Sequence, residues 1–223
     1  MIIEKTKSMR EQAYEILRKM ILDGEIPPGE RIKEIEYSHK FQISRTPIRE
    51  ALRMLELEGL VENNDTGGVI VKKVTGGELR ELYRIRIALE DIVLEEVVKY
   101  ATEEDIAVIE RIIRDTAEQM KKKNDKNVFR LFSRFNLELH RISRLQRVTD
   151  MVKNMTSYLE QIRRMSIENK DRQQAAFADH SEMLELIKNK DLDRLLDLNH
   201  RHLTRSMDFV SKYFGQINEP KAE

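Results

Sequence analysis

Residues 44–53 of the chain read Ser44-Arg45-Thr46-Pro47-Ile48-Arg49-Glu50-Ala51-Leu52-Arg53. Arg45, Arg49 and Arg53 are four residues apart, so on a helix they share one face. The planar fork of an arginine can pair with O6 and N7 of guanine, and an α-helix fits the major groove of DNA. The spacing therefore predicts a helix that reads base edges. The alternative is an ordinary helix whose arginines face solvent.

The opposite face of the same helix is apolar. Ile48, Ala51 and Leu55 recur at helical spacing and predict its buried side. Ser44 is a favoured N-cap residue, and Pro47 lies in the first turn, where a proline removes no hydrogen bond within the helix. This combination indicates an amphipathic helix with a defined start.

Elements on both sides of this helix predict a winged helix-turn-helix. An apolar stripe over residues 13–21 indicates a first helix, and a turn at Pro27-Pro28-Gly29 precedes a short helix over residues 33–41. Beyond a glycine that ends the third helix, residues 60–62 and 69–74 predict two short strands around a polar turn. Three helices are thus followed by a β-hairpin, which would form the wing.

The rest of the chain has a different texture. Residues 78–214 contain neither Gly nor Pro, and their periodicity predicts helices at about 78–101, 103–123, 126–144, 147–169, 171–189 and 191–214. The expected fold class is mainly α, with the winged helix-turn-helix followed by an all-α antiparallel bundle of six to seven helices. We expect a DNA-binding domain over residues 1–75, a helical domain over 76–214 and a flexible tail over 215–223.

Composition limits the function classes. The absence of Cys excludes a disulfide framework, a Cys-ligated zinc finger and an iron–sulfur cluster. No apolar run approaches the roughly 18 residues that span a bilayer, and no signal-peptide core is present. We therefore expect a cytoplasmic protein that does not bind membranes.

The charges balance, because 40 Lys+Arg face 40 Asp+Glu. A DNA-binding protein usually carries a basic surplus. Residues 40–53 nevertheless hold four basic side chains against one acidic side chain, a local excess of +3. Positive charge is concentrated on the helix that would contact DNA. The balanced total therefore argues against binding to DNA of any sequence, but it does not argue against DNA binding itself.

Histidines gather in the helical half, at His140, His180, His200 and His202. Asn136 precedes His140 by four residues, so the two share a helix face and could chelate a metal ion together. His200 and His202 are about 200° apart around a helix, so both cannot contact one ion, and phase does not choose between them. Histidines on three helices form a site only if the fold brings them together. Separate core and surface positions are the alternative.

The N-terminal runs resemble the DNA-binding domain of GntR-type bacterial transcription regulators. The resemblance rests on residues 29–32, 43–52 and 55–61, and the core Ser-Arg-Thr-Pro-x-Arg-Glu-Ala-Leu is highly specific. It implies a homodimer that binds double-stranded, palindromic operator DNA. The residues that we expect at the DNA are Arg31, Arg45, Thr46, Arg49, Arg53 and, at the wing tip, Gly67 and Gly68.

The helical half, which begins Glu81-Leu82-Tyr83-Arg84-Ile85-Arg86-Ile87-Ala88-Leu89-Glu90, is similar to the FadR-type C-terminal (FCD) ligand domain. This similarity implies a small organic-acid effector held by Arg86, although Arg86 could instead pair with Glu90. It also implies a divalent metal ion, with zinc expected before nickel or another transition metal. The implied metal ligands are Asn136, His140, His180 and His202. Asn136 departs from the family's aspartate and brings no negative charge, which lowers the expected metal affinity.

Together these observations predict a ligand-responsive transcription regulator, interpreted as a repressor, and not an enzyme. The first alternative is a metal-dependent hydrolase or lyase that uses the histidine cluster, but no motif places a general base beside the ligands. The second alternative is a helical interaction protein whose DNA-binding domain has lost its function.

Overall fold

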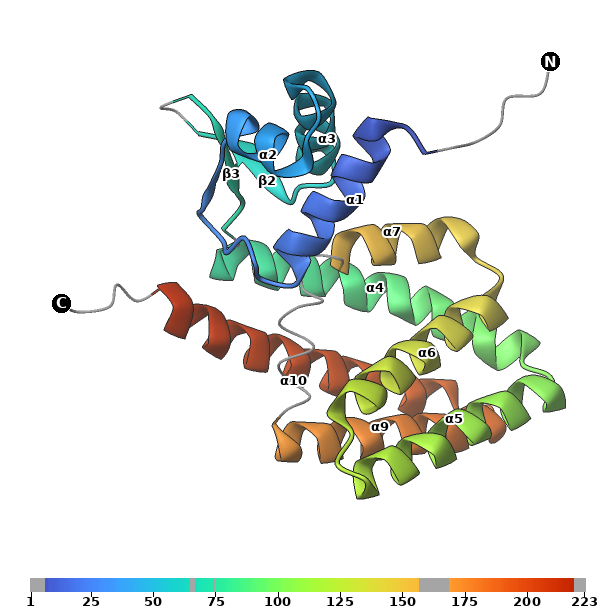
Figure 1. The fold of residues 1–223 in the computed structure, drawn as a ribbon. Helices are drawn as coiled ribbons and strands as arrows, with labels where there is room; N and C mark the ends of the chain where they lie inside the picture. Colours follow the sequence, from blue (N-terminus) through green and yellow to red (C-terminus); the bar gives the residue numbers. More distant parts are fainter. Residues whose placement is uncertain (1–6, 65–66, 74, 157–168, 219–223) are drawn as a thin grey trace, which may run out of the picture. The chain divides into compact units, whose positions relative to one another are not determined.

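The computed structural model of the protein describes residues 7–64, 67–73, 75–156 and 169–218, and the side chains only as far as residue 212 (Figure 1). The chain divides into two compact units, residues 1–74 and 75–223. Both units are built mainly from helices, as the sequence predicts. Of the helices in the described ranges, none is long and apolar enough to cross a membrane.

The first unit combines helices with a small antiparallel sheet. Its elements are α1 (Met9–Leu22), β1 (Arg31–Ile32), α2 (Glu34–Phe41), α3 (Arg45–Leu57), β2 (Val61–Asn63) and β3 (Val69–Val71). The sheet has the order β1-β3-β2, so β3 is central and pairs with both neighbours. The hairpin of β2 and β3 matches the predicted wing. The strand β1 was not predicted, because two residues are too few to show an alternating pattern.

The helices of the first unit begin and end where local chemistry directs them. A capping box of Ser8 and Glu11 starts α1, and Gly24 after its end has a φ of +78°, which suits glycine. Ser44 stands at the N-cap of α3 as predicted, yet its side chain makes no capping hydrogen bond. The third helical position is Pro47, which has no N–H to donate.

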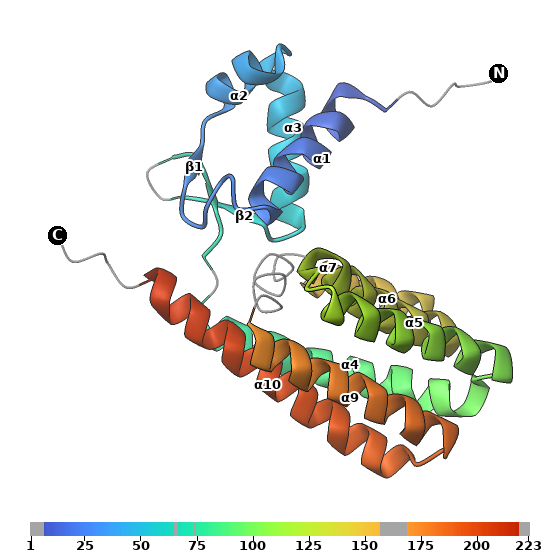
Figure 2. The same ribbon diagram turned by 60° about the horizontal axis from the view of Figure 1, so that its bottom comes forward.

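The second unit is entirely helical in its described part. Its helices are α4 (Gly76–Tyr100), α5 (Glu103–Lys121), α6 (Asp125–Ser143), α7 (Gln146–Thr156), α9 (Lys170–Lys188) and α10 (Leu192–Asn218). The helix α4 packs against α10 and α6, and α9 packs against α10 and α5 (Figure 2). The last helix continues through Gly215, where the sequence suggested a flexible tail. The later part of the helix predicted at 147–169 lies outside the described residues.

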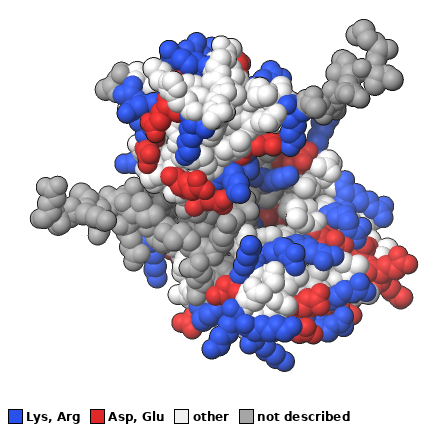
Figure 3. All heavy atoms as spheres, viewed as in Figure 1, with Lys and Arg blue, Asp and Glu red and all other residues white. Residues whose placement is uncertain are grey.

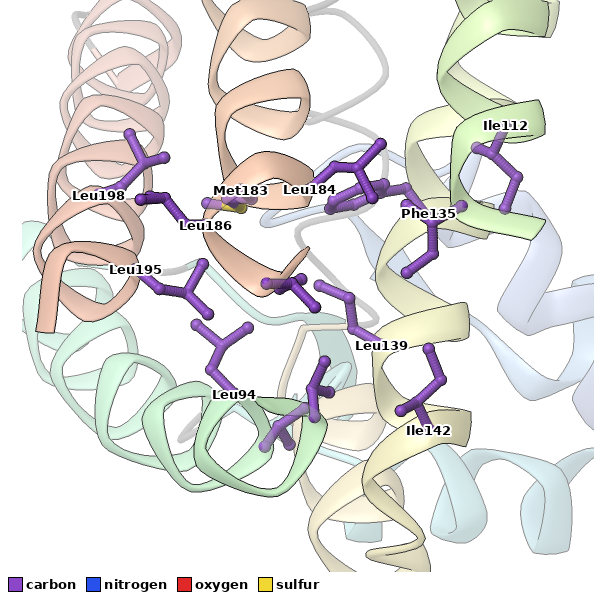
Figure 4. Close-up of a cluster of buried hydrophobic side chains, with 14 of the residues drawn as sticks. Leu94, Ile112, Phe135, Leu139, Ile142, Met183, Leu184, Leu186, Leu195 and Leu198 are labelled. Atoms are coloured by element: carbon purple, nitrogen blue, oxygen red, sulfur yellow. The ribbon is translucent and has the colours of Figure 1, made fainter. Parts of the chain in front are cut away.

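The core of the second unit is a cluster of apolar side chains that come from five helices. Leu94 lies on α4, Ile112 on α5, Leu139 on α6, Met183 on α9 and Leu195 on α10 (Figure 4). All five side chains are buried. Each helix therefore contributes the apolar face that its periodicity predicts, and these faces meet in one layer.

We predict that Leu195→Ala lowers the free energy of unfolding by about 3 kcal/mol, because it opens a cavity where the leucine is 0% exposed. Leu137 on α6 is 58% exposed, so Leu137→Ala serves as the matched control and should change stability by less than about 0.5 kcal/mol. Urea denaturation followed by circular dichroism measures both. Equal destabilisation by the two substitutions would contradict the assigned core.

Candidate functional site

The arginine face of α3 is open to solvent. The side chains of Arg45 and Arg49 are 55% and 52% exposed, and that of Arg53 is 66% exposed. Thr46, in the first turn of α3, is exposed as well. The apolar residues of the opposite face are buried among α1, α2 and the sheet. A rigid helix thus presents the predicted DNA-binding residues on one accessible side.

A single carboxylate holds two of these arginines. Glu34, the first residue of α2, accepts hydrogen bonds from Nε and Nη2 of Arg49, both at 2.9 Å, and from Nη2 of Arg45 at 3.1 Å. The hydrogen bond from Arg49 is the main cause that lowers the pKa of Glu34. Arg53 instead pairs with Glu50, one turn away on its own helix, at 3.1 Å.

Arg31 contacts the predicted wing, which is the hairpin of β2 and β3. This arginine, on β1, donates a hydrogen bond from Nη2 to the carbonyl oxygen of Gly67. Gly68 has a φ of +141°, and a Cβ at this position would lie 2.7 Å from Nε of Arg31. Only glycine permits this close approach of the guanidinium to the backbone. Arg31 therefore positions the predicted wing tip, and its contact with DNA stays a prediction.

A groove of about 510 Å³ lies among α2, α3 and the wing. Its charged lining consists of Arg31, Lys33, Glu34, Glu36, Arg45 and Arg49. The basic side chains outnumber the acidic ones there, so the groove suits an anionic backbone. Elsewhere the signs are interspersed, as the face drawn in Figure 3 shows. Of the basic stretch 40–53, Arg45 and Arg49 line this groove, whereas Lys40 and Arg53 do not.

A small, partly open cavity of about 30 Å³ lies among α4, α6, α9 and α10 of the second unit. Of the residues predicted as metal or effector ligands, Arg86, Asn136, His180 and His202 line it. The tertiary structure therefore brings four of the five predicted residues to one place, from four different helices.

Glu90 is the buried charge beside this cavity. Its Oε1 accepts hydrogen bonds from Nε and Nη2 of Arg86 at 3.3 and 3.4 Å, and its Oε2 lies 3.1 Å from Nε2 of His140. Burial opposes ionisation of Glu90, but the contact with His140 and the charge of Arg86 outweigh it and lower the pKa to about 2. The alternative left open for Arg86, a pair with Glu90, is thus present in the structure.

His140 is the predicted metal ligand that does not line the cavity. Its Nε2 faces Glu90, and its Nδ1 lies 3.2 Å from Oγ1 of Thr149, so both ring nitrogens are engaged by the protein. Within the described ranges, no group of three His, Cys, Asp or Glu side chains is placed to hold a metal ion. In this arrangement His140 does not join Asn136, His180 and His202 at the cavity, so the predicted set of four metal ligands is not assembled.

His200 and His202, two residues apart on α10, have different surroundings in the structure. Nδ1 of His202 lies 2.8 Å from Oδ2 of Asp179, while His202 lines the cavity. His200 lies outside it, with Nε2 2.7 Å from Oδ2 of Asp91 on α4. The contact with Asp179 occupies Nδ1 of His202 and leaves Nε2 as its second nitrogen. Burial lowers the pKa of His202, which favours the neutral ring.

His180 is fixed by aromatic rings. It stacks on Phe135 with ring centroids 4.2 Å apart, and Phe132 approaches edge-on at 4.9 Å. The ring of His202 lies 5.1 Å away. These contacts set the plane of the imidazole at the cavity wall.

Arg172 is a cavity residue that sequence reasoning did not find. It lies in the first turn of α9 and lines the cavity, and its buried Nε and Nη1 have no hydrogen-bond partner among the described residues. Burial also lowers its pKa, because desolvation disfavours the charged form. A buried arginine donor without an acceptor is costly, which makes it a candidate binding group for an anion. No motif or spacing distinguishes this arginine in the sequence.

Comparisons of the sequence with known proteins point to one class of protein, the transcription regulators. A model of the FCD domain matches residues 81–205, and a model of bacterial regulatory proteins of the gntR family matches residues 9–71. The chain is 31% identical to the uncharacterised HTH-type regulator YdhC of Bacillus subtilis over 80% of each chain. It is 25% identical to the HTH-type transcriptional repressor RspR of Escherichia coli, over 98% of this chain and 94% of that protein. Among solved structures, E. coli McbR/YncC shares the fold with a TM-score of 0.73 at 18% identity, over 94% of this chain and 100% of that one.

We predict that Glu90→Gln lowers the free energy of unfolding by on the order of 3 kcal/mol, because it leaves the buried guanidinium of Arg86 without a counter-charge. The control is Glu104→Gln on α5, an exposed glutamate whose neutralisation should have little effect. Urea denaturation at neutral pH compares the two. If Glu90→Gln leaves the free energy of unfolding unchanged, as the control does, Glu90 does not stabilise the buried guanidinium of Arg86.

Proposed function

This chain belongs to the gntR family of bacterial regulatory proteins and carries an FCD domain, and on that premise we propose that it is an effector-controlled repressor. Members of the family are DNA-binding transcription regulators and not enzymes, so the prediction that the chain is no enzyme is confirmed. The proposal adds a palindromic operator, a homodimer and a small carboxylate effector. The effector proposal rests on two buried nitrogens of Arg172, Nε and Nη1, which find no acceptor among the described residues.

The chemistry of the cavity favours an anion. Two guanidiniums, those of Arg86 and Arg172, line it together with His202 and Ser206. A carboxylate can accept two parallel hydrogen bonds from one arginine. On Arg172 it could accept from Nε together with Nη2, and Nη1 would need a second acceptor. The small volume favours a small organic acid. Arg172 is the main anchor in this proposal, and Arg86, which is shared with Glu90, is the secondary one.

The effector would act by stabilising one arrangement of the helices. Residues from α4, α6, α9 and α10 line the cavity, so a bound carboxylate contacts all four helices. A ligand changes DNA binding only if it binds one arrangement more tightly than another. Because α4 follows the DNA-binding unit directly in the chain, a shift of α4 is the simplest means of communication.

A homodimer is supported by an exposed apolar stripe on α4. Ile85, Ala88, Leu89 and Ile92 follow one another at helical spacing, and Ile85 and Ile92 are 45% and 44% exposed. A second copy of the chain could bury this stripe. The twofold symmetry of such a dimer matches a palindromic operator. Repression is proposed because a relative that matches nearly the whole chain is named a repressor.

The divalent metal, with zinc expected first, remains a separate prediction. Asn136, His180 and His202 offer an amide oxygen and two imidazoles to the cavity. His140 would have to leave Glu90 and Thr149 to complete the set. The carboxylate proposal does not depend on the metal, because Arg172 is an anion-binding group by itself.

We predict that Arg49→Ala reduces affinity for the operator about tenfold or more, because it removes one arginine fork from the reading helix. The operator would be selected from randomised duplexes with the unaltered protein, and affinity would be measured by mobility shift at physiological salt. Arg10→Ala, on the exposed side of α1, is the control and should bind normally. A protein that prefers no sequence over bulk DNA would contradict the proposed function.

We predict that small carboxylates, from acetate to citrate, include at least one that raises the melting temperature of the protein, and that Arg172→Gln abolishes this shift. Without ligand, Arg172→Gln should melt at the same temperature or higher, because it removes an unpaired buried charge. Arg130→Gln, an exposed arginine on α6, should keep the shift.

The same thermal-shift measurement tests the metal. Protein treated with a chelator should keep the carboxylate-induced shift if Arg172 is the anchor. Loss of the shift after chelation, with its return on adding zinc, would support the site of Asn136, His140, His180 and His202. Retention of the shift in Arg172→Gln would remove this arginine from the effector site.

A further inference from the structure

We propose that Glu34 is a positioning residue of the reading helix, which holds Arg45 and Arg49 in place and thereby sets the preference for operator over bulk DNA. The inference rests on the DNA-binding function proposed above and assigns a role to an acidic residue. It starts from the contacts of one carboxylate on α2 with two arginines on α3.

The geometry is that of a clamp rather than a loose surface pair. Glu34 meets Arg49 through two parallel hydrogen bonds of 2.9 Å, and it meets Arg45 through a third of 3.1 Å. The side chain of Glu34 is 23% exposed, whereas both arginines are more than half exposed. The carboxylate thus lies at the base of the two guanidiniums, whose other donors remain accessible. Holding two long side chains in advance reduces the entropy that DNA binding would cost.

The clamp leaves the base-reading donors free. Arg49 uses Nε and one N–H of Nη2, so Nη1 and the second N–H of Nη2 remain. Arg45 uses one N–H of Nη2 only. Guanine needs two N–H donors, one for O6 and one for N7, and Arg49 keeps three N–H groups while Arg45 keeps four. Glu34 can therefore stay in place while the arginines contact bases.

The same carboxylate weakens binding that does not depend on sequence. It contributes a negative charge to the groove that Arg31, Lys33, Arg45 and Arg49 line. Attraction to phosphates scales with the positive charge presented, whatever the base sequence. Glu34 therefore reduces bulk affinity while it orients the base contacts, and both effects increase the ratio of operator affinity to bulk affinity.

The test compares Glu34→Gln with Glu36→Gln. Both glutamates lie in the first turn of α2 and in the same groove, so each substitution removes one negative charge from the same place. No ion pair of Glu36 is seen among the described residues, so only Glu34→Gln weakens the clamp. The probes are the operator duplex selected with the unaltered protein and sonicated genomic DNA. Affinity is measured for both probes across a series of salt concentrations.

For Glu34→Gln we expect the ratio of operator to bulk affinity to fall about tenfold, with bulk affinity raised. For Glu36→Gln we expect bulk affinity to rise similarly while the ratio changes less than about twofold. Glu34→Ala, which removes every acceptor, should lower the ratio at least as far as Glu34→Gln. Circular dichroism confirms that each variant is folded.

Two outcomes would overturn the proposal. If the two Gln variants change the ratio equally, Glu34 acts through charge alone. If Glu34→Gln raises operator affinity as much as bulk affinity, Glu34 competes with DNA for the arginines and does not position them. Both outcomes are distinct from failure of the proposed function, in which the unaltered protein would select no operator.

Discussion

A buried charge is costly without a counter-charge, and in the second unit the buried carboxylate of Glu90 lies against the guanidinium of Arg86. This carboxylate contacts Arg86 of its own helix and His140 of α6. Asp179 likewise contacts His202 and Arg205. Nε and Nη1 of Arg172 have no acceptor among the described residues, which is the observation behind the proposed anion site.

The same rule acts with a different result at the surface of the first unit. Glu34 pairs with Arg45 and Arg49, but the pairs are half exposed, so they cost little to form and contribute little to stability. In our proposal these pairs matter because they orient the side chains of Arg45 and Arg49. The chain has no net charge. A DNA-binding protein without surplus positive charge must depend on the geometry of base contacts more than on attraction to phosphates. A carboxylate that holds the arginines suits a protein of this kind.

Local pattern was sufficient for much of the fold. The periodicity around Ile48 predicts α3 and its buried face, and the change of texture near residue 75 separates two kinds of sequence. Pattern was insufficient where an element is short or depends on a distant partner. β1 exists because Arg31 and Ile32 pair with β3, almost forty residues later in the chain. Gly215 did not end α10, since one residue with low helix propensity costs only about 1 kcal/mol.

The sequence by itself determined the class of the protein, the arginine face of the reading helix and the set of candidate ligands, because these depend on residue type and on spacing within single helices. The tertiary structure alone decided which candidates meet. In the structure His202 lines the cavity, whereas His200 contacts Asp91. His140 contacts Glu90 instead of the cavity. Arg172 also lines the cavity, although no motif in the sequence distinguishes it. The physical reason is that helix phase is a local property, whereas the partner of a side chain depends on how helices far apart in sequence pack.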